Sequence, residues 1–485
     1  MADHLLVIDE GTTSTRAMLF RPDGACVASE SAELTQHYPR PGWVEHDAAE
    51  IWRKTLRVTA AMVAQAGGAD QIAGIGITNQ RETVVFWDKA TGEPLAPAIV
   101  WQDRRTAGRC RALAEAGHEA LVQARTGLLL DPYFSGSKIG WAMAEWPELA
   151  GAGDRLAVGT IDSWLLYKLT RSHLTDATNA SRTALMALGG GWDDELIDLF
   201  GAPRAALPEI IDCAGPIGET TLFGGRIAIT GMAGDQQAAT IGQACLAPGD
   251  TKATYGTGAF VLTHTGATIP SSRNRLLATV AWQLGGTRAY ALEGSVFVAG
   301  SLVQWLRDSL GLIATAAETQ ALAASVPDTA GAYLVPALSG LGAPWWKPEA
   351  RAALTGMSFA TTRAHIVRAA LEAQGYQTHD LMTAFAADGA AWQSLRIDGG
   401  MVANDWLAQD LADVLCLPVE RPRFAETTAL GAAMLAGVGA ELFRNLEEAR
   451  TMRGEVERFD ATLNRAAATV RLTGWADAVA KIVAS

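Results

Sequence analysis

Two strand–turn–strand segments with glycine and hydroxyl residues in their turns are the strongest constraint on the fold. In the first, apolar strands at 5–8 and 17–20 flank Gly11-Thr12-Thr13-Ser14. In the second, strand-like residues flank Gly256-Thr257-Gly258. A tight hairpin needs no hydroxyl-rich tip, whereas amides and hydroxyls at a glycine turn suit phosphate oxygens. One such hairpin in each half of the chain predicts a duplicated α/β fold, although each tip alone is also compatible with an ordinary polar loop.

The composition fits a globular enzyme of two domains. The chain has 485 residues, of which 49% are hydrophobic and 19% charged. A net charge of −13 disfavours nucleic acid and anionic membrane surfaces as partners. Five scattered cysteines without Cys-x-x-Cys spacing predict neither a disulfide framework nor a zinc site, and they favour a cytoplasmic location. Neither a leader peptide nor membrane insertion is expected from the apolar pattern.

Asp235 lies in Gly234-Asp235-Gln236-Gln237, between a strand predicted at 226–230 and a helical run of small residues. A carboxylate at such a turn can accept a proton from a hydroxyl group, in the favourable field of nearby helix-end amides. Aspartate is also a common helix cap. This stretch alone leaves both interpretations open.

Arg81 and Glu82 follow a buried strand predicted at 72–77. Ligands of open α/β sheets gather at the carboxyl ends of such strands. The pair can be a solvated ion pair in a turn or a donor and an acceptor for neighbouring hydroxyl groups. Trp101 ends a further predicted strand at 98–101, and its pattern alone indicates a core residue. A third glycine turn at 398–400 offers room for a flat nucleotide base.

Together these parts match the needs of phosphoryl transfer, which depends on positioning and on neutralising phosphate charge. Thr12, Thr13 and Ser14 supply hydroxyls and amides, and Arg16 adds a fixed positive charge. Asp9, at the end of the first strand, can hold Mg²⁺ through water. The Gly-x-x-x-x-Gly-Lys-Ser/Thr pattern is absent from the sequence, so the hairpins take its place in an ATP- and Mg²⁺-dependent kinase.

Six stretches of the sequence together resemble the FGGY family of carbohydrate kinases, over nearly the whole chain. They are Pro-Gly-Trp-Val-Glu-His-Asp at 41–47, Gly-Ile-Thr-Asn-Gln-Arg-Glu-Thr at 76–83, Pro-Tyr-Phe-Ser-Gly at 132–136, Thr-Asn-Ala-Ser-Arg-Thr at 178–183, Gly-Asp-Gln-Gln-Ala-Ala at 234–239 and Tyr-Gly-Thr-Gly at 255–258. The resemblance implies two actin- and hexokinase-like (ribonuclease H-like) domains, each with a mixed five-stranded sheet, on either side of a deep interdomain cleft. The expected domains are 1–246, for the polyol, the phosphate hairpin and the catalytic base, and 247–485, for the nucleotide.

The resemblance also implies a reaction, the ATP-dependent phosphorylation of glycerol to sn-glycerol 3-phosphate, and roles for single residues. Asp235 matches the general base. The expected ligands of the polyol hydroxyls are Arg81, Glu82, Tyr133, Asp235 and Gln236, with Trp101 and Phe260 as apolar walls. The expected nucleotide and phosphate ligands are Thr12, Thr13, Ser14, Arg16, Thr257, Gly300, Gln304, Gly400 and Asn404. Asp9 matches the position near Mg²⁺.

Two alternatives remain beside this expectation. One is a kinase for another small polyol or ketose, such as erythritol, dihydroxyacetone or a pentulose, and the other is a non-catalytic, nucleotide-dependent sensor on the same fold. Relatives imply a homo-oligomer, either a dimer or a tetramer. Glu10 departs from the family, which usually has glutamine there. A carboxylate beside phosphates would repel them unless it faces away or binds metal.

Overall fold

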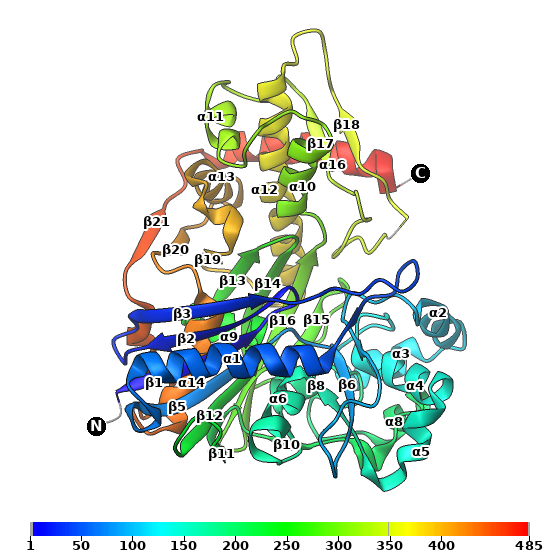
Figure 1. Cartoon of the computed structure of the whole chain (residues 1–485). Helices are drawn as coiled ribbons and strands as arrows, with labels where there is room; N and C mark the ends of the chain where they lie inside the picture. Colours follow the sequence, from blue (N-terminus) through cyan, green and yellow to red (C-terminus); the bar gives the residue numbers. More distant parts are fainter. Residues whose placement is uncertain (1–2, 348, 484–485) are drawn as a thin grey trace.

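The computed structural model describes residues 3–347 and 349–483, and within them two mixed sheets of six and seven strands form the centres of the two halves (Figure 1). The sheet of the N-terminal half, up to residue 246, has the order β11-β12-β5-β1-β2-β3. Its strands are β1 (His4–Glu10), β2 (Ser14–Phe20), β3 (Cys26–Glu33), β5 (Ile72–Asn79), β11 (Ala214–Thr220) and β12 (Ile227–Gly234).

The sheet of the C-terminal half has the order β15-β16-β14-β13-β19-β20-β21. Its strands are β13 (Thr251–Tyr255), β14 (Ala259–Gly266), β15 (Leu277–Leu284), β16 (Thr287–Val296), β19 (Leu395–Asp398), β20 (Val419–Pro422) and β21 (Val456–Phe459). The smaller strands of the chain are β4 (Glu45–His46), β6 (Val84–Asp88), β7 (Ala98–Ile99), β8 (Leu156–Thr160), β9 (Leu174–Asp176), β10 (Glu209–Ile211), β17 (Tyr333–Val335) and β18 (Ala353–Thr355).

Five strands in each sheet share one topology. In the N-terminal half, β1 and β2 and then β2 and β3 pair antiparallel, while β1 and β5 and then β5 and β12 pair parallel. In the C-terminal half, β13, β14, β16, β19 and β20 repeat this pattern in the same sequence order. The expected duplication of a five-stranded mixed sheet is therefore confirmed. The described residues add β11 to one sheet, and β15 and β21 to the other.

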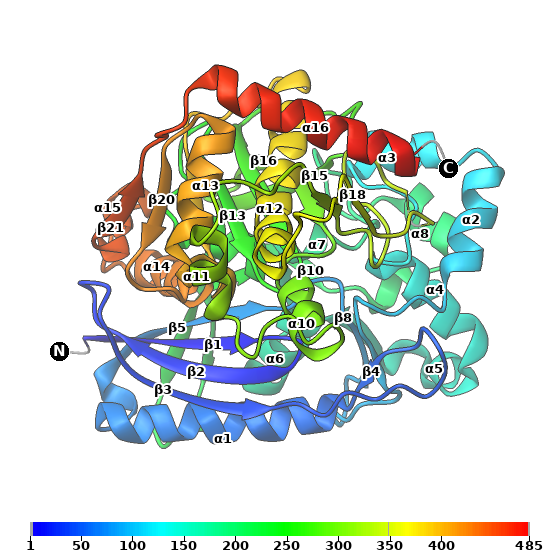
Figure 2. The ribbon, with the colours of Figure 1, turned by 90° about the horizontal axis from the view of Figure 1, so that it is seen from above.

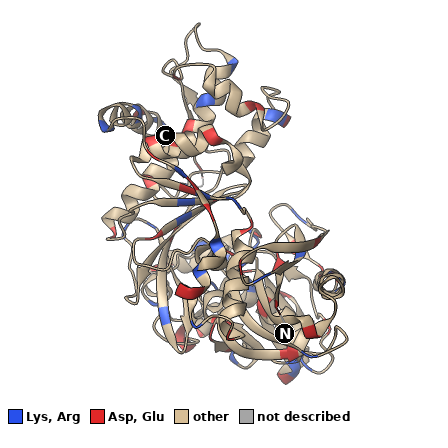
Figure 3. Cartoon of the chain, turned by 90° about the vertical axis from the view of Figure 1, so that its left-hand side faces the viewer, with Lys and Arg blue, Asp and Glu red and all other residues tan. Residues whose placement is uncertain are grey.

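Helices cover both sheets. In Figures 1 and 2, α1 runs along the face of β1, β2 and β3, and α10 to α13 gather over the C-terminal half. The helices are α1 (Ala48–Ala66), α2 (Ala107–Glu115), α3 (Glu119–Thr126), α4 (Ser135–Glu145), α5 (Pro147–Ala152), α6 (Ile161–Thr170), α7 (Ala177–Ala180), α8 (Asp194–Phe200), α9 (Asp235–Gly242), α10 (Gly300–Asp308), α11 (Glu318–Ala324), α12 (Arg363–Ala387), α13 (Asp405–Leu415), α14 (Thr427–Gly439), α15 (Leu446–Ala449) and α16 (Arg465–Val483). Acidic and basic residues are interspersed over both halves (Figure 3).

Across residues 3–347 and 349–483, we find no helix with the length and apolarity needed to cross a membrane.

Helix α14 belongs to the C-terminal half by sequence but packs on α9 and on β12, β5 and β1 of the N-terminal half. Its contact with α9 is close, because a Cβ atom on Gly431 would lie 1.8 Å from the carbonyl oxygen of Ala238. Helix α9 begins with Asp235, so α14 supports the element that presents this carboxylate. The domain boundary after residue 246 stays a prediction.

We expect Gly431→Ala to destabilise the protein, since the added methyl group meets helix backbone that must move. The cost of such overpacking is about 1–3 kcal/mol. Denaturant unfolding of the variant and the wild type measures this cost. The matched control is Gly108→Ala in α2, where an added Cβ meets no atom within 4 Å. The control should be neutral or slightly stabilising. Equal effects of the two substitutions would contradict the close helix contact.

Candidate active site

The parallel strands of the N-terminal sheet bring the candidate residues to one edge. The last residues of β1, β5 and β12 are paired in register, Glu10 with Asn79 and Asn79 with Gly234. Each strand therefore ends at the same level, and the residue that follows β12 is Asp235. This is the edge at which ligands bind in open α/β sheets.

Asp235 is the first residue of α9, and its side chain remains 33% exposed. Its Oδ1 accepts a hydrogen bond of 2.7 Å from the backbone N–H of Gln236 and lies 3.1 Å from Nε of Arg81. Gly234, rather than Asp235, occupies the capping position. A side chain on Gly234 would collide with Arg81, whose Cγ would lie 2.8 Å from the added Cβ.

The surroundings of Asp235 tune its affinity for a proton. Burial raises the pKa of this carboxyl above its usual value, and the positive charges of Arg81 and Lys252 oppose that shift. A carboxylate with a raised pKa is a stronger base than one in water. Asp235 thus combines partial exposure with the basicity that a proton acceptor needs.

Arg81 and Glu82 lie in the turn that leads from β5 to β6, and the interpretation as a solvated pair is wrong. Their exposed fractions are only 2% and 1%. Glu82 has a φ of 64°, a backbone conformation that non-glycine residues rarely adopt. Its carbonyl oxygen is held by Oγ of Ser135 at 3.0 Å. Backbone strain held by neighbouring groups is common at functional sites.

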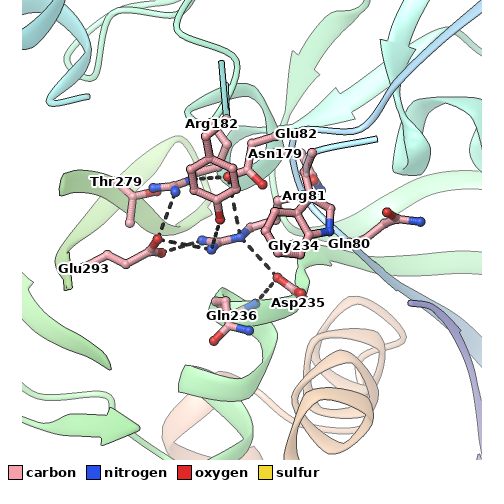
Figure 4. A network of polar contacts seen from close by, with 12 residues as sticks. Gln80, Arg81, Glu82, Asn179, Arg182, Gly234, Asp235, Gln236, Thr279 and Glu293 are labelled. Carbon is pink, nitrogen blue, oxygen red and sulfur yellow. Dashed lines mark hydrogen bonds and ion pairs between the residues drawn. The ribbon is translucent and has the colours of Figure 1, made fainter. Parts of the chain in front are cut away.

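Four buried side chains of alternating charge form a closed ring, which we call the charge ring and which Figure 4 shows. Arg81 Nη1 lies 2.6 Å from Glu293 Oε2, and Glu293 Oε1 lies 2.9 Å from Arg182 Nη2. Arg182 Nε then lies 2.7 Å from Glu82 Oε1, which is 3.9 Å from Arg81 Nε. Each charge therefore has two neighbours of opposite sign.

Three charged residues of the site were missed by sequence reasoning. Arg182 lies in the stretch 178–183, which supports the family resemblance but predicts no role for this residue. Glu293 is the single charged residue in the apolar run Tyr290-Ala291-Leu292-Glu293-Gly294. This pattern in the sequence could have identified it. Lys252 Nζ donates to Oε1 of Gln236, and to Oγ1 of Thr254 at 2.9 Å. Because an ammonium group only donates, Gln236 keeps its amide N–H groups free for another acceptor.

The expected aromatic walls lie beside this ring of charges. Trp101 and Tyr133 pack edge to face with ring centroids 5.5 Å apart. Arg81 Nη2 donates to the Tyr133 hydroxyl at 3.5 Å, in the longest of the described hydrogen bonds of Arg81. Phe260 pairs with Ser295 in the sheet, two residues from the pair of Leu262 and Glu293. It therefore shares a sheet face with Glu293.

The first hairpin is connected to the aromatic wall. Trp101 Nε1 donates to Oγ1 of Thr12 at 2.9 Å. Gly11 N–H donates to the carbonyl oxygen of Ser14 at 3.0 Å, and the carbonyl of Thr13 accepts from Leu34 at 2.8 Å. The turn that carries the expected phosphate ligands is thus fixed from both sides.

Arg16 and Asp9 lie where the first hairpin meets the C-terminal half. Arg16 Nη1 forms an ion pair of 2.6 Å with Glu426, the residue before α14. Burial raises the pKa of Asp9 to about 6, with Arg16 opposing the shift and the carboxylates of Glu426 and Asp235 adding to it. A cation bound at Asp9 would offset the repulsion that Glu426 and Asp235 exert on its carboxylate.

The predicted nucleotide ligands of the C-terminal half line one cavity of about 460 Å³. They are Thr257, Gly300, Gln304, Gly400 and Asn404. Helix α10 begins at Gly300, and the second hairpin contributes Gly256 and Thr257 to the cavity lining. A helix N-terminus beside a glycine turn favours bound phosphate. Leu371, Met401 and Leu407 supply an apolar part of the lining.

Glu10 faces away from the hairpin tip. It is fully buried, and its Oε2 accepts a hydrogen bond of 2.9 Å from Oγ1 of Thr55 on α1. Burial raises the pKa of Glu10 to about 8, although hydrogen bonds from Thr15 and Thr55 favour the ionised form. Glu10 is therefore protonated at neutral pH. An uncharged carboxyl group does not repel the phosphates, so the repulsion considered from the sequence does not arise.

Comparison with known proteins gives matches over both halves. Residues 4–242 match the N-terminal domain of the FGGY family of carbohydrate kinases, and residues 251–440 match its C-terminal domain. A glycerol kinase of Methylobacterium nodulans is 54% identical over 487 residues, which cover 98% of this chain and 97% of that protein. A glycerol kinase of Rhodospirillum rubrum is 56% identical over 449 residues, 90% of each chain.

Solved structures show the same likeness. The crystal structure of Plasmodium falciparum glycerol kinase with ADP superposes with a TM-score of 0.94 at 35% identity, covering 99% of this chain and 98% of that one. A gluconate kinase from Lactobacillus acidophilus has a TM-score of 0.88 at 21% identity over 99% and 98% of the two chains, which shows the fold alone.

We expect Glu10→Gln to stabilise the protein at alkaline pH. The folded state keeps the proton of Glu10 up to about pH 8, whereas the unfolded chain releases it near pH 4.5. Wild-type stability therefore falls as pH rises between these values, and glutamine removes this loss. The gain at pH 8 should be about 4 kcal/mol, because the pKa differs by about 3.5 between the two states, and it should nearly vanish at pH 4.5. Denaturant unfolding at both pH values measures it.

The control for this measurement is Glu115→Gln, which replaces an exposed glutamate at the end of α2. The control should change stability equally at both pH values. A Glu10→Gln variant that is no more stable than the wild type at pH 8 would contradict the protonated state of Glu10.

Proposed function

Since the chain belongs to the FGGY family of carbohydrate kinases, we propose that it transfers the γ-phosphoryl group of ATP to glycerol, forming sn-glycerol 3-phosphate and ADP. Relatives named glycerol kinase match it at more than half identity over nearly the whole chain, which supports this substrate. The observation that carries the proposal is the position of Asp235. Its partly exposed carboxylate starts a helix 3.1 Å from Arg81, close to Gln236 and the aromatic pair.

In the proposed reaction, glycerol lies between the charge ring and the aromatic wall. Arg81, Glu82 and Tyr133 orient its hydroxyl groups, and Gln236 donates through the amide that Lys252 leaves free. Trp101 and Phe260 contact its carbon chain. Adjacent donors and acceptors can hold two neighbouring hydroxyl groups of a short polyol, which fixes the third for attack.

Asp235 accepts the proton of the terminal hydroxyl group as its oxygen attacks the γ-phosphorus of ATP. The bond from that phosphorus to the bridging oxygen breaks, and ADP leaves. Amides and hydroxyls of the first hairpin, at Thr12, Thr13 and Ser14, and of the second, at Thr257, stabilise the charge on the phosphoryl oxygens. Such positioning and electrostatic stabilisation supply most of the catalysis of phosphoryl transfer.

Mg²⁺ belongs to this proposal, and the residues present fit it. The carboxylate of Asp9 has its pKa raised in part by Glu426 and Asp235, so a cation is favoured there. Magnesium in kinases is held by one or two carboxylates together with substrate phosphates. The metal would neutralise phosphate charge, and Asp9 would hold it. In residues 3–347 and 349–483, we find no cluster of three or more metal-ligating side chains.

A cytoplasmic location and a dimeric or tetrameric assembly complete the proposal and rest on family membership. Light scattering of the purified protein measures the assembly, and a monomeric mass would contradict it.

An ADP-release assay across glycerol, dihydroxyacetone, erythritol and pentuloses tests the substrate. We expect the highest kcat/KM for glycerol, with glycerol 3-phosphate as the product identified by mass spectrometry. A higher kcat/KM for any other compound would assign the enzyme to that substrate instead. ATP hydrolysis that no polyol alters would support a nucleotide-dependent sensor.

We expect Asp235→Asn to lower kcat by about 10²–10⁴-fold, because asparagine keeps the shape but cannot accept the proton. Glycerol affinity should change less, since Arg81 and Tyr133 remain. Steady-state kinetics and calorimetric glycerol binding separate the two effects. The matched control is Asp194→Asn, which alters the exposed first residue of α8. Near-normal turnover of Asp235→Asn would exclude this residue as the base.

A further inference from the structure

Glu293 is a charged residue in the apolar interior of the C-terminal sheet. It lies on β16, opposite Leu262 of β14 and Leu277 of β15, and its exposed fraction is 0%. An isolated carboxylate in such a place costs several kcal/mol, so it must be paired. Both of its oxygens are occupied by arginines of the N-terminal half, Arg81 and Arg182.

The contact with Arg81 is bidentate and end-on, through both terminal nitrogens of the guanidinium. Nη1 of Arg81 lies 2.6 Å from Oε2 of Glu293, and Nη2 lies 3.3 Å from Oε1. Two parallel contacts between a planar guanidinium and a planar carboxylate fix the plane of the arginine. Nε of Arg81 then points to Asp235 at 3.1 Å, and the outer Nη2–H points to the Tyr133 hydroxyl at 3.5 Å.

The N–H groups of Arg81 that point to Asp235 and to Tyr133 are the ones relevant to ligand binding. Asp235 and Tyr133 are both expected to contact the polyol. A hydroxyl group that enters between them can take an N–H of Arg81 without disturbing the 2.6 Å contact of Nη1 with Glu293. Figure 4 shows Arg81 between Glu293 on one side and Asp235 on the other.

Arg182 adds to the contacts that hold Glu293 and Tyr133 in place. Its Nη2 lies 2.9 Å from Oε1 of Glu293, and its guanidinium carbon lies 5.6 Å from the centre of the Tyr133 ring. Glu293 therefore touches Arg81 directly and reaches Tyr133 through Arg182. Its backbone, in turn, is fixed between two neighbouring strands of the sheet.

We propose that Glu293 is a positioning residue for the polyol, supplied by the half of the chain that holds the nucleotide. It sets the plane of Arg81 so that this guanidinium can bind a substrate hydroxyl beside Asp235. The inference rests on the proposed polyol kinase activity. It makes polyol affinity depend on the contact between the two halves, while the nucleotide cavity, lined by other residues, stays independent of it.

The test is the steady-state kinetics of Glu293→Gln with glycerol and with ATP as the varied substrate. Glutamine keeps the size of the side chain but loses the charge and one acceptor, so the two-point contact that fixes the plane of Arg81 is lost. Hydrogen bonds to charged groups contribute enough for a change of tenfold or more in binding. We expect the glycerol KM to rise at least tenfold and the ATP KM to stay within about twofold.

A matched control separates positioning from stability. Glu372→Gln also removes a buried glutamate that is paired with two arginines, Arg368 and Arg471, but on α12 and away from the ring of charges. Both variants should lower the melting temperature, and only Glu293→Gln should raise the glycerol KM. If Glu293→Gln does not fold, Glu293→Asp keeps the charge but is one methylene too short for both contacts. It should raise the glycerol KM by a smaller factor.

Three outcomes would overturn the inference. They are a glycerol KM unchanged in a folded Glu293 variant, equal changes in the glycerol and ATP KM values, and an equal rise in the glycerol KM of Glu372→Gln. Failure of the proposed function looks different, because the wild type itself would then prefer a compound other than glycerol. In that case the same comparison is made with the preferred polyol, and an unchanged KM for it would overturn the inference.

Discussion

The closed arrangement of Arg81, Glu293, Arg182 and Glu82 is the interaction on which the candidate site depends. All four side chains are at most 2% exposed. Removing one charge would leave its neighbours unpaired in a dry interior, at a cost of about 3–5 kcal/mol. Because Glu293 comes from the other half of the chain, the two halves cannot slide at this point without separating buried charges. The orientation of Arg81 is therefore a property of the whole molecule.

The duplicated topology explains why the two ligand regions lie where they do. In the N-terminal sheet, β1, β5 and β12 end in register, which places Asp9, the turn with Arg81, and Asp235 along one edge. In the C-terminal sheet, the hairpin of β13 and β14 and the start of α10 enclose the cavity assigned to the nucleotide. Helix α14 then joins the halves, because glycine lets it pack directly on α9.

Sequence patterns predicted much of this arrangement from local chemistry. The apolar runs located β1, β2, β5 and β12, and family motifs named residues that line one cavity, from Thr257 to Asn404. The burial of Arg81 and Glu82 was not predictable from the turn itself. Two adjacent charges after a strand are usually solvated. Their burial is stable only when partners from distant segments of the chain pair with both charges.

The sequence by itself determined the family, the duplicated α/β fold and the identity of the candidate base, because these follow from strand periodicity and from motifs of neighbouring residues. The tertiary structure decided which charges meet. Glu293 lies on a strand far along the chain from Arg81, Lys252 approaches Gln236 from the other sheet, and Glu426 reaches Arg16 from the start of α14. It also decided that Glu10 faces α1 and is protonated. Ion pairs and pKa values depend on distance and burial in space, and these are fixed only when the halves pack together.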